Sequence, residues 1–242
     1  MDKAALDAIQ QRIRERNHVS RLLNDMKKEI GQLESSMAKL KKEHLMSSSG
    51  GNCEEDSDPN VTKHHMFDEK LADVLSWFFT GQTVVGFADG PGQYRDHLLK
   101  QGRVISYDAY DVAPFVEKVT GGAVKFMDLT LPQYGLPAYD WVMCLEVAEH
   151  IPARYERILV DNMARHARKG VVLSWANISQ GGINHVNNKS SEDVKTLLDE
   201  AGFYPDNSAT QYMRNQSVNN HLRVNNIVFR RKPEAIFHEE DA

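Results

Sequence analysis

The sequence predicts a doubly wound α/β fold with a mostly parallel sheet, preceded by an N-terminal α-helical coiled coil. From about residue 63 onward, short β-branched and apolar runs alternate with amphipathic segments, a pattern typical of parallel sheets. A turn of small residues, 88–92, follows the first apolar run and leads into a helical segment. The first 45 residues contain no proline and carry a heptad repeat. These three observations fix the expected architecture.

The composition excludes several classes of protein. The net charge of −5 and the lack of a basic stripe argue against a nucleic-acid partner. No apolar run is long enough to span a bilayer, and the N-terminus does not read as a signal peptide, so we expect a cytoplasmic protein without membrane contact. The two cysteines, Cys53 and Cys144, form neither a disulfide framework nor a zinc pattern. His64 and His65 have no partner at ligand spacing, and no metal site is expected.

The N-terminal segment carries apolar residues at alternating spacings of three and four, which is the a/d seam of a coiled coil. Upstream, Leu6, Ile9 and Ile13 follow the same rhythm in a shifted frame. We therefore expect a homo-oligomer assembled through residues 6–44. The alternative is a single amphipathic helix docked on the globular domain. The seam residues are Leu23, Met26, Ile30, Leu33, Met37 and Leu40.

The remaining chain divides into three parts. Residues 46–62 are rich in serine and glycine and then acidic, which predicts a flexible linker after a coiled-coil helix at 1–45. Residues 63–232 form the predicted globular domain, and 233–242 an acidic tail. Within the domain, helices are expected at 68–79, 94–101, 153–167 and 191–201. Strands are expected at 83–87, 103–107, 123–127, 139–145, 170–175, 209–213 and 226–230.

Polar and small residues follow the predicted strands, at the edge where open α/β sheets bind ligands. The first strand is followed by the turn of Ala88, Asp89, Gly90 and Gly92. Asp108 follows the second strand and is placed to accept hydrogen bonds from a ribose, with Asp111 as a competitor for the role. The later strand ends carry Asp128, then Glu146, Glu149 and His150, and finally the loop that contains His185.

The turn favours a sulfonium nucleoside over a dinucleotide. A full dinucleotide fingerprint needs a glycine at position 95, which is Arg95. Asp89 would repel a pyrophosphate, whereas a ligand with a sulfonium and an ammonium group would be attracted to it. A nicotinamide-dependent oxidoreductase is therefore disfavoured.

The segment from about 68 to 232 resembles the class I S-adenosylmethionine-dependent methyltransferases, including methyltransferase-like proteins of unassigned substrate. The turn is similar to their D/E-x-G-x-G-x-G loop, and 139–152 to their D-x-V-x-x-x-E-V-x-E-H-I/V signature. The resemblance implies a Rossmann-like seven-stranded sheet and S-adenosyl-L-methionine as cofactor. It implies binding of that cofactor by Ala88, Asp89, Gly90, Gly92, Asp108, Asp128 and Glu146, and catalysis by His150 and Glu149 with His185 nearby.

Two hypotheses about function remain at this point. The first is methyl transfer to an oxygen or nitrogen of a small-molecule acceptor. The second is a weak or inactive methyltransferase fold that serves as a scaffold multimerised by its coiled coil, because Gly86 replaces the usual acid and Ala88 the first glycine. Structural alternatives exist for the later strand ends: an Asx turn at Asp128, helix N-terminal chemistry at 146–150, and a structural loop around His185.

Overall fold

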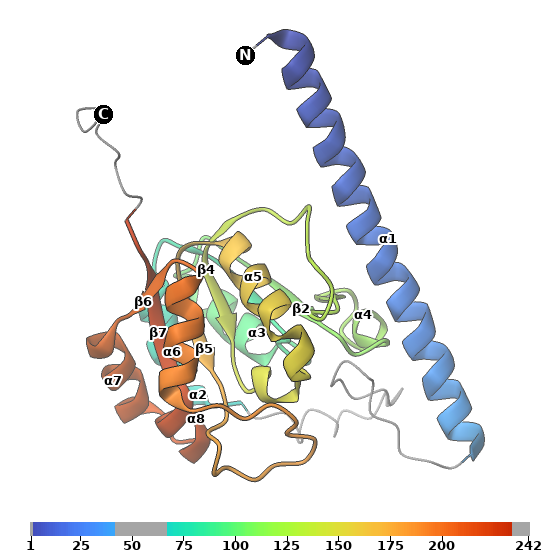
Figure 1. The fold of residues 1–242 in the computed structure, drawn as a ribbon. Helices are drawn as coiled ribbons and strands as arrows, with labels where there is room; N and C mark the ends of the chain where they lie inside the picture. Colours follow the sequence, from blue (N-terminus) through green and yellow to red (C-terminus); the bar gives the residue numbers. More distant parts are fainter. Residues whose placement is uncertain (1, 42–66, 234–242) are drawn as a thin grey trace.

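The computed structural model describes residues 2–41 and 67–233 (Figure 1). Its centre is a seven-stranded sheet in the order β3-β2-β1-β4-β5-β7-β6, in which β7 runs antiparallel to both β5 and β6. The predicted fold class is confirmed. The strands are β1 (Thr83–Phe87), β2 (Ser106–Asp111), β3 (Val124–Phe126), β4 (Tyr139–Cys144), β5 (Ala167–Ser174), β6 (Phe203–Pro205) and β7 (Asn226–Arg231).

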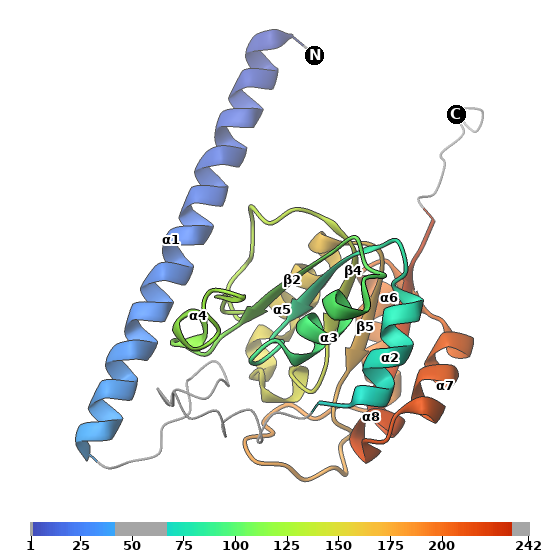
Figure 2. The same ribbon diagram turned by 180° about the vertical axis from the view of Figure 1, so that it is seen from behind.

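Helices cover both faces of the sheet, as Figures 1 and 2 show from opposite sides. Successive strand residues point to opposite faces, so each strand feeds two cores. One core packs α2, α3, α7 and α8 on the sheet through Leu75, Leu98 and Met213, and the other packs α5 and α6 through Leu159 and Leu198. The domain helices are α2 (Glu69–Phe78), α3 (Gln93–Gln101), α4 (Val116–Val119), α5 (Glu156–His166), α6 (Ser191–Glu200), α7 (Asn207–Gln216) and α8 (Asn220–Asn225).

Two predicted strands are wrong in place or type. The second strand lies at Ser106–Asp111 and not at 103–107, which moves its carboxyl end by four residues. The segment 209–213, expected as a strand, lies inside helix α7. The Asp206 side chain caps this helix by accepting a hydrogen bond from the Ala209 amide, and Thr210 and Met213 are buried three residues apart, at helical spacing. The short edge strand β6, which the sequence reading missed, precedes it.

The long N-terminal helix α1 (Lys3–Lys41) runs along one side of the domain (Figure 1) and contacts it through polar side chains. Ser20 donates to the Pro132 carbonyl at 3.1 Å, and Gln32 donates to the Pro114 carbonyl at 3.1 Å. Lys28 forms an ion pair with Glu117. Although burial acts in the opposite direction, hydrogen bonds from Lys28 and from a backbone amide hold the pKa of Glu117 below its usual value. The helix is therefore held by hydrogen bonds and charge.

The apolar residues of α1 lie on a different face and are exposed. Leu33 is 65 % exposed and Leu40 is 86 % exposed. The described part of α1 matches the predicted helix. The expected linker at 46–62 and the expected acidic tail at 233–242, apart from residue 233, lie outside the described residues. Within 2–41 and 67–233, no helix combines the length and the apolar character needed to cross a bilayer.

Candidate functional site

The loop after β1 folds over the end of β2. The Asp89 amide donates to the Tyr110 carbonyl at 3.0 Å, and the Gly90 amide donates to the Asp111 carboxylate at 3.0 Å. Gly92, with φ of 86°, provides the left-handed residue from which α3 starts. The predicted turn therefore joins two adjacent strand ends and a helix N-terminus, which is the arrangement expected of a nucleotide-like site.

The Asp89 carboxylate lies on the inner side of this loop. It accepts hydrogen bonds from the Tyr107 hydroxyl at 3.1 Å and from the Arg95 amide at 3.3 Å. Burial raises the pKa of Asp89 to about 7, and the nearby carboxylates of Asp111 and Asp96 act in the same direction, while the two hydrogen bonds act against them. A cationic group at this position would stabilise the charged carboxylate.

Residue 86 must be glycine, because neighbouring side chains leave no room for a Cβ atom. A Cβ atom on this residue would lie 2.6 Å from the Tyr107 hydroxyl and 2.9 Å from Cγ of Asp89. The space beside Gly86 is therefore filled by Asp89 and Tyr107, and any side chain at residue 86 would displace them.

The two candidate ribose acids lie in different places. Asp108 is inside β2, paired with Val85, and accepts a hydrogen bond from the Tyr139 hydroxyl at 2.6 Å. Asp111 is the last residue of β2, beside the glycine loop. The sequence reading missed this because it ended the strand at 107. The apolar residues Ala109 and Tyr110, which continue the run beyond Asp108 and are buried, were the available signal for a longer strand.

Asp128 is buried after β3 and is held by its own loop. One carboxylate oxygen accepts the Thr130 amide at 2.8 Å and the Thr130 hydroxyl at 2.6 Å, which is the geometry of an Asx turn. Its amide donates to Asn24 at 2.9 Å, and Lys27 lies 3.7 Å from its carboxylate. Helix α1 therefore reaches the predicted adenine end of the site. No local sequence signal indicated this contact, because the partners are about one hundred residues apart.

The turn after β4 places Glu146 beside the end of β5. Glu146 has a left-handed φ of 55°, and its carboxylate accepts a hydrogen bond from the Ser174 hydroxyl at 2.8 Å. Burial raises the pKa of Glu146, against the effect of the Ser174 hydrogen bond and the nearby His221 and His185. Ser174 thereby links the two strand ends on this side of the site.

Glu149, His150 and His185 come together next to Glu146. The first two belong to the 3₁₀ turn Ala148–His150, and His185 comes from the loop after β5. Their ligand-type atoms all lie within 4.8 Å of one another. The amides of Val186 and Asn187 donate to the Glu149 carbonyl at 2.9 and 3.0 Å, which fixes the loop against the turn. The structure thus brings together the three residues to which the resemblance gave catalytic roles.

Glu149 is fully buried. Its two carboxylate oxygens have no hydrogen-bond partner of ordinary geometry among the residues the structure describes. Burial raises the pKa of Glu149 to about 7, with a further contribution from Glu146, while the amides of Glu149 and Ala176 act in the other direction. Burial lowers the pKa of His150, whose Nδ1 lies 3.2 Å from the Asn184 carbonyl. Burial therefore favours the neutral form of both Glu149 and His150.

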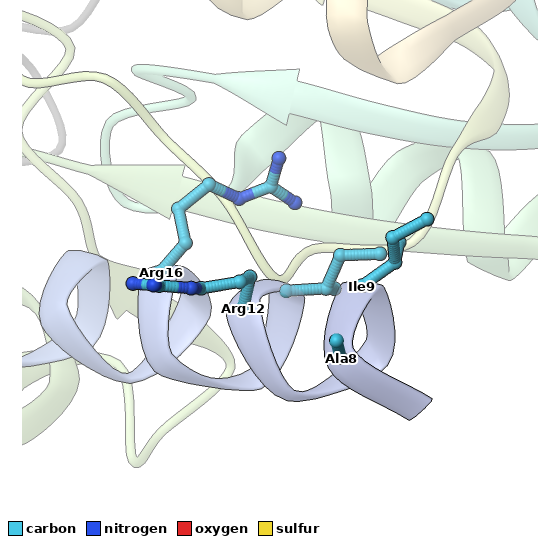
Figure 3. A pocket seen from close by; sticks show the side chains of 5 residues that line it. Ala8, Ile9, Arg12 and Arg16 are labelled. Carbon is cyan, nitrogen blue, oxygen red and sulfur yellow. The ribbon is translucent and has the colours of Figure 1, made fainter. Parts of the chain in front are cut away.

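A surface hollow lies away from these strand ends. It is lined by Ala8, Ile9, Arg12, Ile13 and Arg16, all from the N-terminal half of α1 (Figure 3). The Arg16 guanidinium stacks over the Tyr134 ring at 4.2 Å. The hollow belongs to the exposed surface of α1 and contains none of the site residues.

Comparison with known proteins gives matches only at the level of structure. No protein-family model matches the chain, and no curated protein matches it. An O-methyltransferase family protein from Burkholderia thailandensis shares 16 % identity and a TM-score of 0.51 over 74 % of this chain and 59 % of its own. A TehB-like SAM-dependent methyltransferase from Corynebacterium glutamicum shares 13 % identity and a TM-score of 0.50 over 72 % and 92 %. Magnesium protoporphyrin IX methyltransferase from Synechocystis PCC 6803, with bound SAH, shares 19 % identity and a TM-score of 0.49 over 68 % of this chain and 83 % of its own.

At these identities a structural likeness establishes the fold and leaves the activity open. The mostly parallel seven-stranded sheet with helices on both faces and the TM-scores of 0.51 and 0.50 for the first two of these matches support a shared fold. The chain has the fold of the class I S-adenosylmethionine-dependent methyltransferases.

Proposed function

We propose that this protein binds S-adenosyl-L-methionine and transfers its methyl group to an oxygen or nitrogen of a small-molecule acceptor. The observation that carries the proposal is the hydrogen bond from the Gly90 amide to Asp111, which closes the glycine loop on the acid that ends β2. This contact places a bare backbone turn and a carboxylate at one sheet edge, as a nucleoside requires.

Each side of the cofactor has a proposed partner. Asp111, and not Asp108, accepts hydrogen bonds from the ribose, because it is the residue at the strand end. Asp89 faces the ammonium group of the methionine part, which keeps the carboxylate charged. Glu146 contributes from the end of β4. Asp128 remains the candidate for the adenine end, with its side chain turned into its own loop in this conformation.

The acceptor side is assigned to Glu149, His150 and His185. The acceptor's lone pair forms a bond to the methyl carbon while the carbon–sulfur bond breaks, and the electron pair of that bond stays on sulfur. The proton that the acceptor loses passes to His150 or Glu149, with His185 beside them. Most of the rate enhancement comes from alignment of acceptor, methyl carbon and sulfur.

Calorimetric titration with S-adenosyl-L-methionine tests the proposal. We expect saturable binding by the wild type and a loss of roughly 100-fold in affinity in Asp111→Ala, because two hydrogen bonds to a charged group are removed. Asp108→Ala, which removes only the partner of Tyr139, serves as the matched control and retains most of the affinity. Absence of binding by the wild type contradicts the proposal. A loss of affinity confined to Asp108→Ala would show that Asp108, and not Asp111, binds the ribose.

We further propose that the chain self-associates through the apolar stripe of α1. The residues that contact the domain, such as Asn24 and Gln32, occupy positions of the heptad that face away from its a/d seam. A second copy of the same helix fits the seam, because charges of both signs flank it and the apolar run is too long to be a common solvent-facing surface. A purely scaffolding role is the alternative, and turnover of S-adenosyl-L-methionine by the purified protein excludes it. The cytoplasmic location stays a prediction.

The mass of the protein in solution tests the self-association. We expect a multiple of 27.5 kDa for the wild type and 27.5 kDa for the double variant Ile30→Lys, Leu33→Lys, in which two charges enter the seam. Asp25→Lys introduces the same side chain at an exposed position outside the stripe and leaves the mass unchanged. A monomeric wild type contradicts this part of the proposal.

A further inference from the structure

We infer that Glu149, His150 and His185 form a binding site for a divalent transition-metal ion of the zinc class. No metal site was expected from the sequence, because the ligands come from two distant segments with no recognised spacing between them. The juxtaposition is produced by the fold: a tight turn after β4 supplies two neighbouring residues, and the loop after β5 supplies the third.

Several buried polar atoms of these residues are unpaired within the described part of the chain. Both carboxylate oxygens of Glu149 and Nδ1 of His185 are buried and have no hydrogen-bond partner of ordinary geometry among the described residues. Burial of such groups without a partner costs free energy, and proteins rarely retain it without a reason. A cation between the three side chains would satisfy these atoms together. The carboxylate of Glu146, on the same turn, adds a second negative charge that favours a cation.

The types and separations of the three side chains fit a zinc site. Two imidazoles and one carboxylate are a known set for catalytic zinc, which leaves at least one coordination position open. Ligand atoms about 2.1 Å from zinc lie at most about 4.2 Å from each other, so the observed separation within 4.8 Å needs only small side-chain rotations. The two imidazole rings meet edge to face at a centroid distance of 5.0 Å, which leaves their nitrogens unbonded to each other. Nitrogen donors select zinc and its neighbours over calcium or magnesium.

Residues around the two histidines hold their rings in place. Nδ1 of His150 lies 3.2 Å from the Asn184 carbonyl, which would fix the proton on that nitrogen and leave Nε2 as the ligand. Gly182 lies directly against the other histidine, since a Cβ atom on it would be 2.1 Å from Nε2 of His185. The adjacent Gly181 has nothing within 4 Å of its Cβ position. The loop is therefore shaped around the His185 ring at one glycine and not at the other.

The metal site itself is independent of the proposed function, but its role in methyl transfer rests on that function. With the ion bound, one nitrogen of His150 and one oxygen of Glu149 are occupied by the ion, so direct proton transfer to these residues describes the ion-free protein only. The open coordination position would instead bind the acceptor oxygen or nitrogen and promote the loss of its proton to water. The ion would thus both orient the acceptor and make it nucleophilic.

Metal titration of the full chain, first freed of metal with a chelator, tests the inference in the absence of S-adenosyl-L-methionine. Zn²⁺ is titrated by calorimetry, and Co²⁺ is titrated by visible absorption, which reports its coordination by nitrogen ligands. We expect saturation at one ion per chain in both titrations. Glu149→Gln and His150→Gln, which keep the shape of the side chains, should each weaken binding by at least about 100-fold, since even outer-shell changes cost 10- to 100-fold.

The two adjacent glycines provide the matched control. Gly182→Ala should lower the affinity for the ion by about 10-fold, because the added methyl group displaces His185. Gly181→Ala should leave the affinity unchanged. Circular dichroism confirms that each variant is folded. Absence of a saturable site in the wild type, or equal binding by wild type and His150→Gln, overturns the inference. The cofactor titration tests Asp111 and Asp108, whereas the metal titration tests Glu149 and His150. Cofactor binding can therefore fail while metal binding holds, and the reverse.

Discussion

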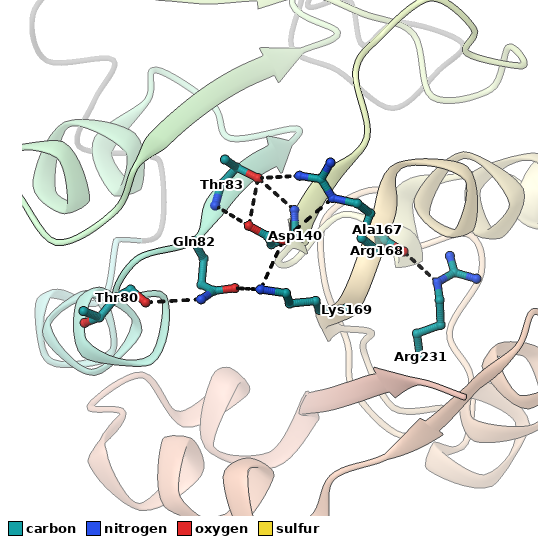
Figure 4. Close-up of polar contacts among 8 residues, drawn as sticks. All are labelled: Thr80, Gln82, Thr83, Asp140, Ala167, Arg168, Lys169 and Arg231. Atoms are coloured by element: carbon teal, nitrogen blue, oxygen red, sulfur yellow. Dashed lines mark hydrogen bonds and ion pairs between the residues drawn. The ribbon is translucent and has the colours of Figure 1, made fainter. Parts of the chain in front are cut away.

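The two edges of the same sheet place carboxylates in opposite environments, paired at one edge and desolvated at the other. At the amino-terminal edge, Asp140 is surrounded by partners (Figure 4): it accepts hydrogen bonds from the Thr83 amide at 2.9 Å and the Thr83 hydroxyl at 3.1 Å, and Lys169 lies 3.3 Å away. Although partial burial acts against them, these contacts hold the pKa of Asp140 below its usual value. At the carboxyl edge, burial raises the pKa of Asp89 and of Glu149 to about 7.

Backbone strain follows the same division. Among the described residues, Ala88, Glu146 and Asn184 are the non-glycine residues with positive φ, and all three lie at the carboxyl edge or in the loops beside it. Left-handed geometry costs an L-residue about 1–2 kcal/mol. The amino-terminal edge therefore contributes to stability, while the carboxyl edge retains strained and poorly solvated groups that a ligand or ion can stabilise.

The largest effect on the free energy of unfolding is expected from removing the carboxylate of Asp140 at the amino-terminal edge. Asp140→Ala removes the acceptor of the Thr83 amide and the partner of Lys169, and we expect a loss of about 2–3 kcal/mol in the free energy of unfolding, measured by urea denaturation at pH 7. Because the folded-state pKa of Asp140 is depressed, its contribution is present above the unfolded value near 4 and is lost as the pH falls through the folded value. The difference from wild type should therefore shrink at acid pH. Impaired cofactor affinity in this variant would contradict the division between the edges.

A smaller effect of opposite sign is expected at the carboxyl edge. Asp89→Asn should raise the free energy of unfolding of the cofactor-free protein by about 1–2 kcal/mol at pH 8, because it removes a charge that burial disfavours. The folded-state pKa of about 7 lies above the unfolded value of 3.8, so wild type loses stability relative to the variant as the pH rises from about 4 to 7. The same variant should bind S-adenosyl-L-methionine more weakly. A stability difference independent of pH would refute this assignment.

The smallest effect concerns the strained backbone of the glycine loop. Ala88→Gly should raise the free energy of unfolding by about 0.5 kcal/mol, since relief of the left-handed conformation exceeds the greater chain entropy of glycine. Thermal and urea denaturation measure the gain. Gly181→Ala, at an exposed loop position, is the control for a simple change between glycine and alanine. A destabilised Ala88→Gly would show that the Ala88 methyl group contributes packing that outweighs the strain.

The residues of α1 illustrate how far a local pattern reaches. The heptad spacing predicted a long helix with an apolar stripe, and the structure has this helix at Lys3–Lys41. The pattern could not indicate that the helix docks by its polar face, because Asn24 and Lys27 meet Asp128 only after the domain has folded. Docking therefore leaves the stripe exposed, in contrast to the alternative of an amphipathic helix whose apolar face is buried on the domain.

The sequence by itself determined the alternation of strands and helices, the glycine turn, and the set of acids that follow the strands. These features are local, because side-chain periodicity and turn chemistry depend on near neighbours. The tertiary structure decided that Asp111 and not Asp108 meets the turn, because one shift in strand boundary changes which residue stands at the edge. It also decided that Glu149, His150 and His185 meet, because parallel strands bring distant segments to one edge of the sheet.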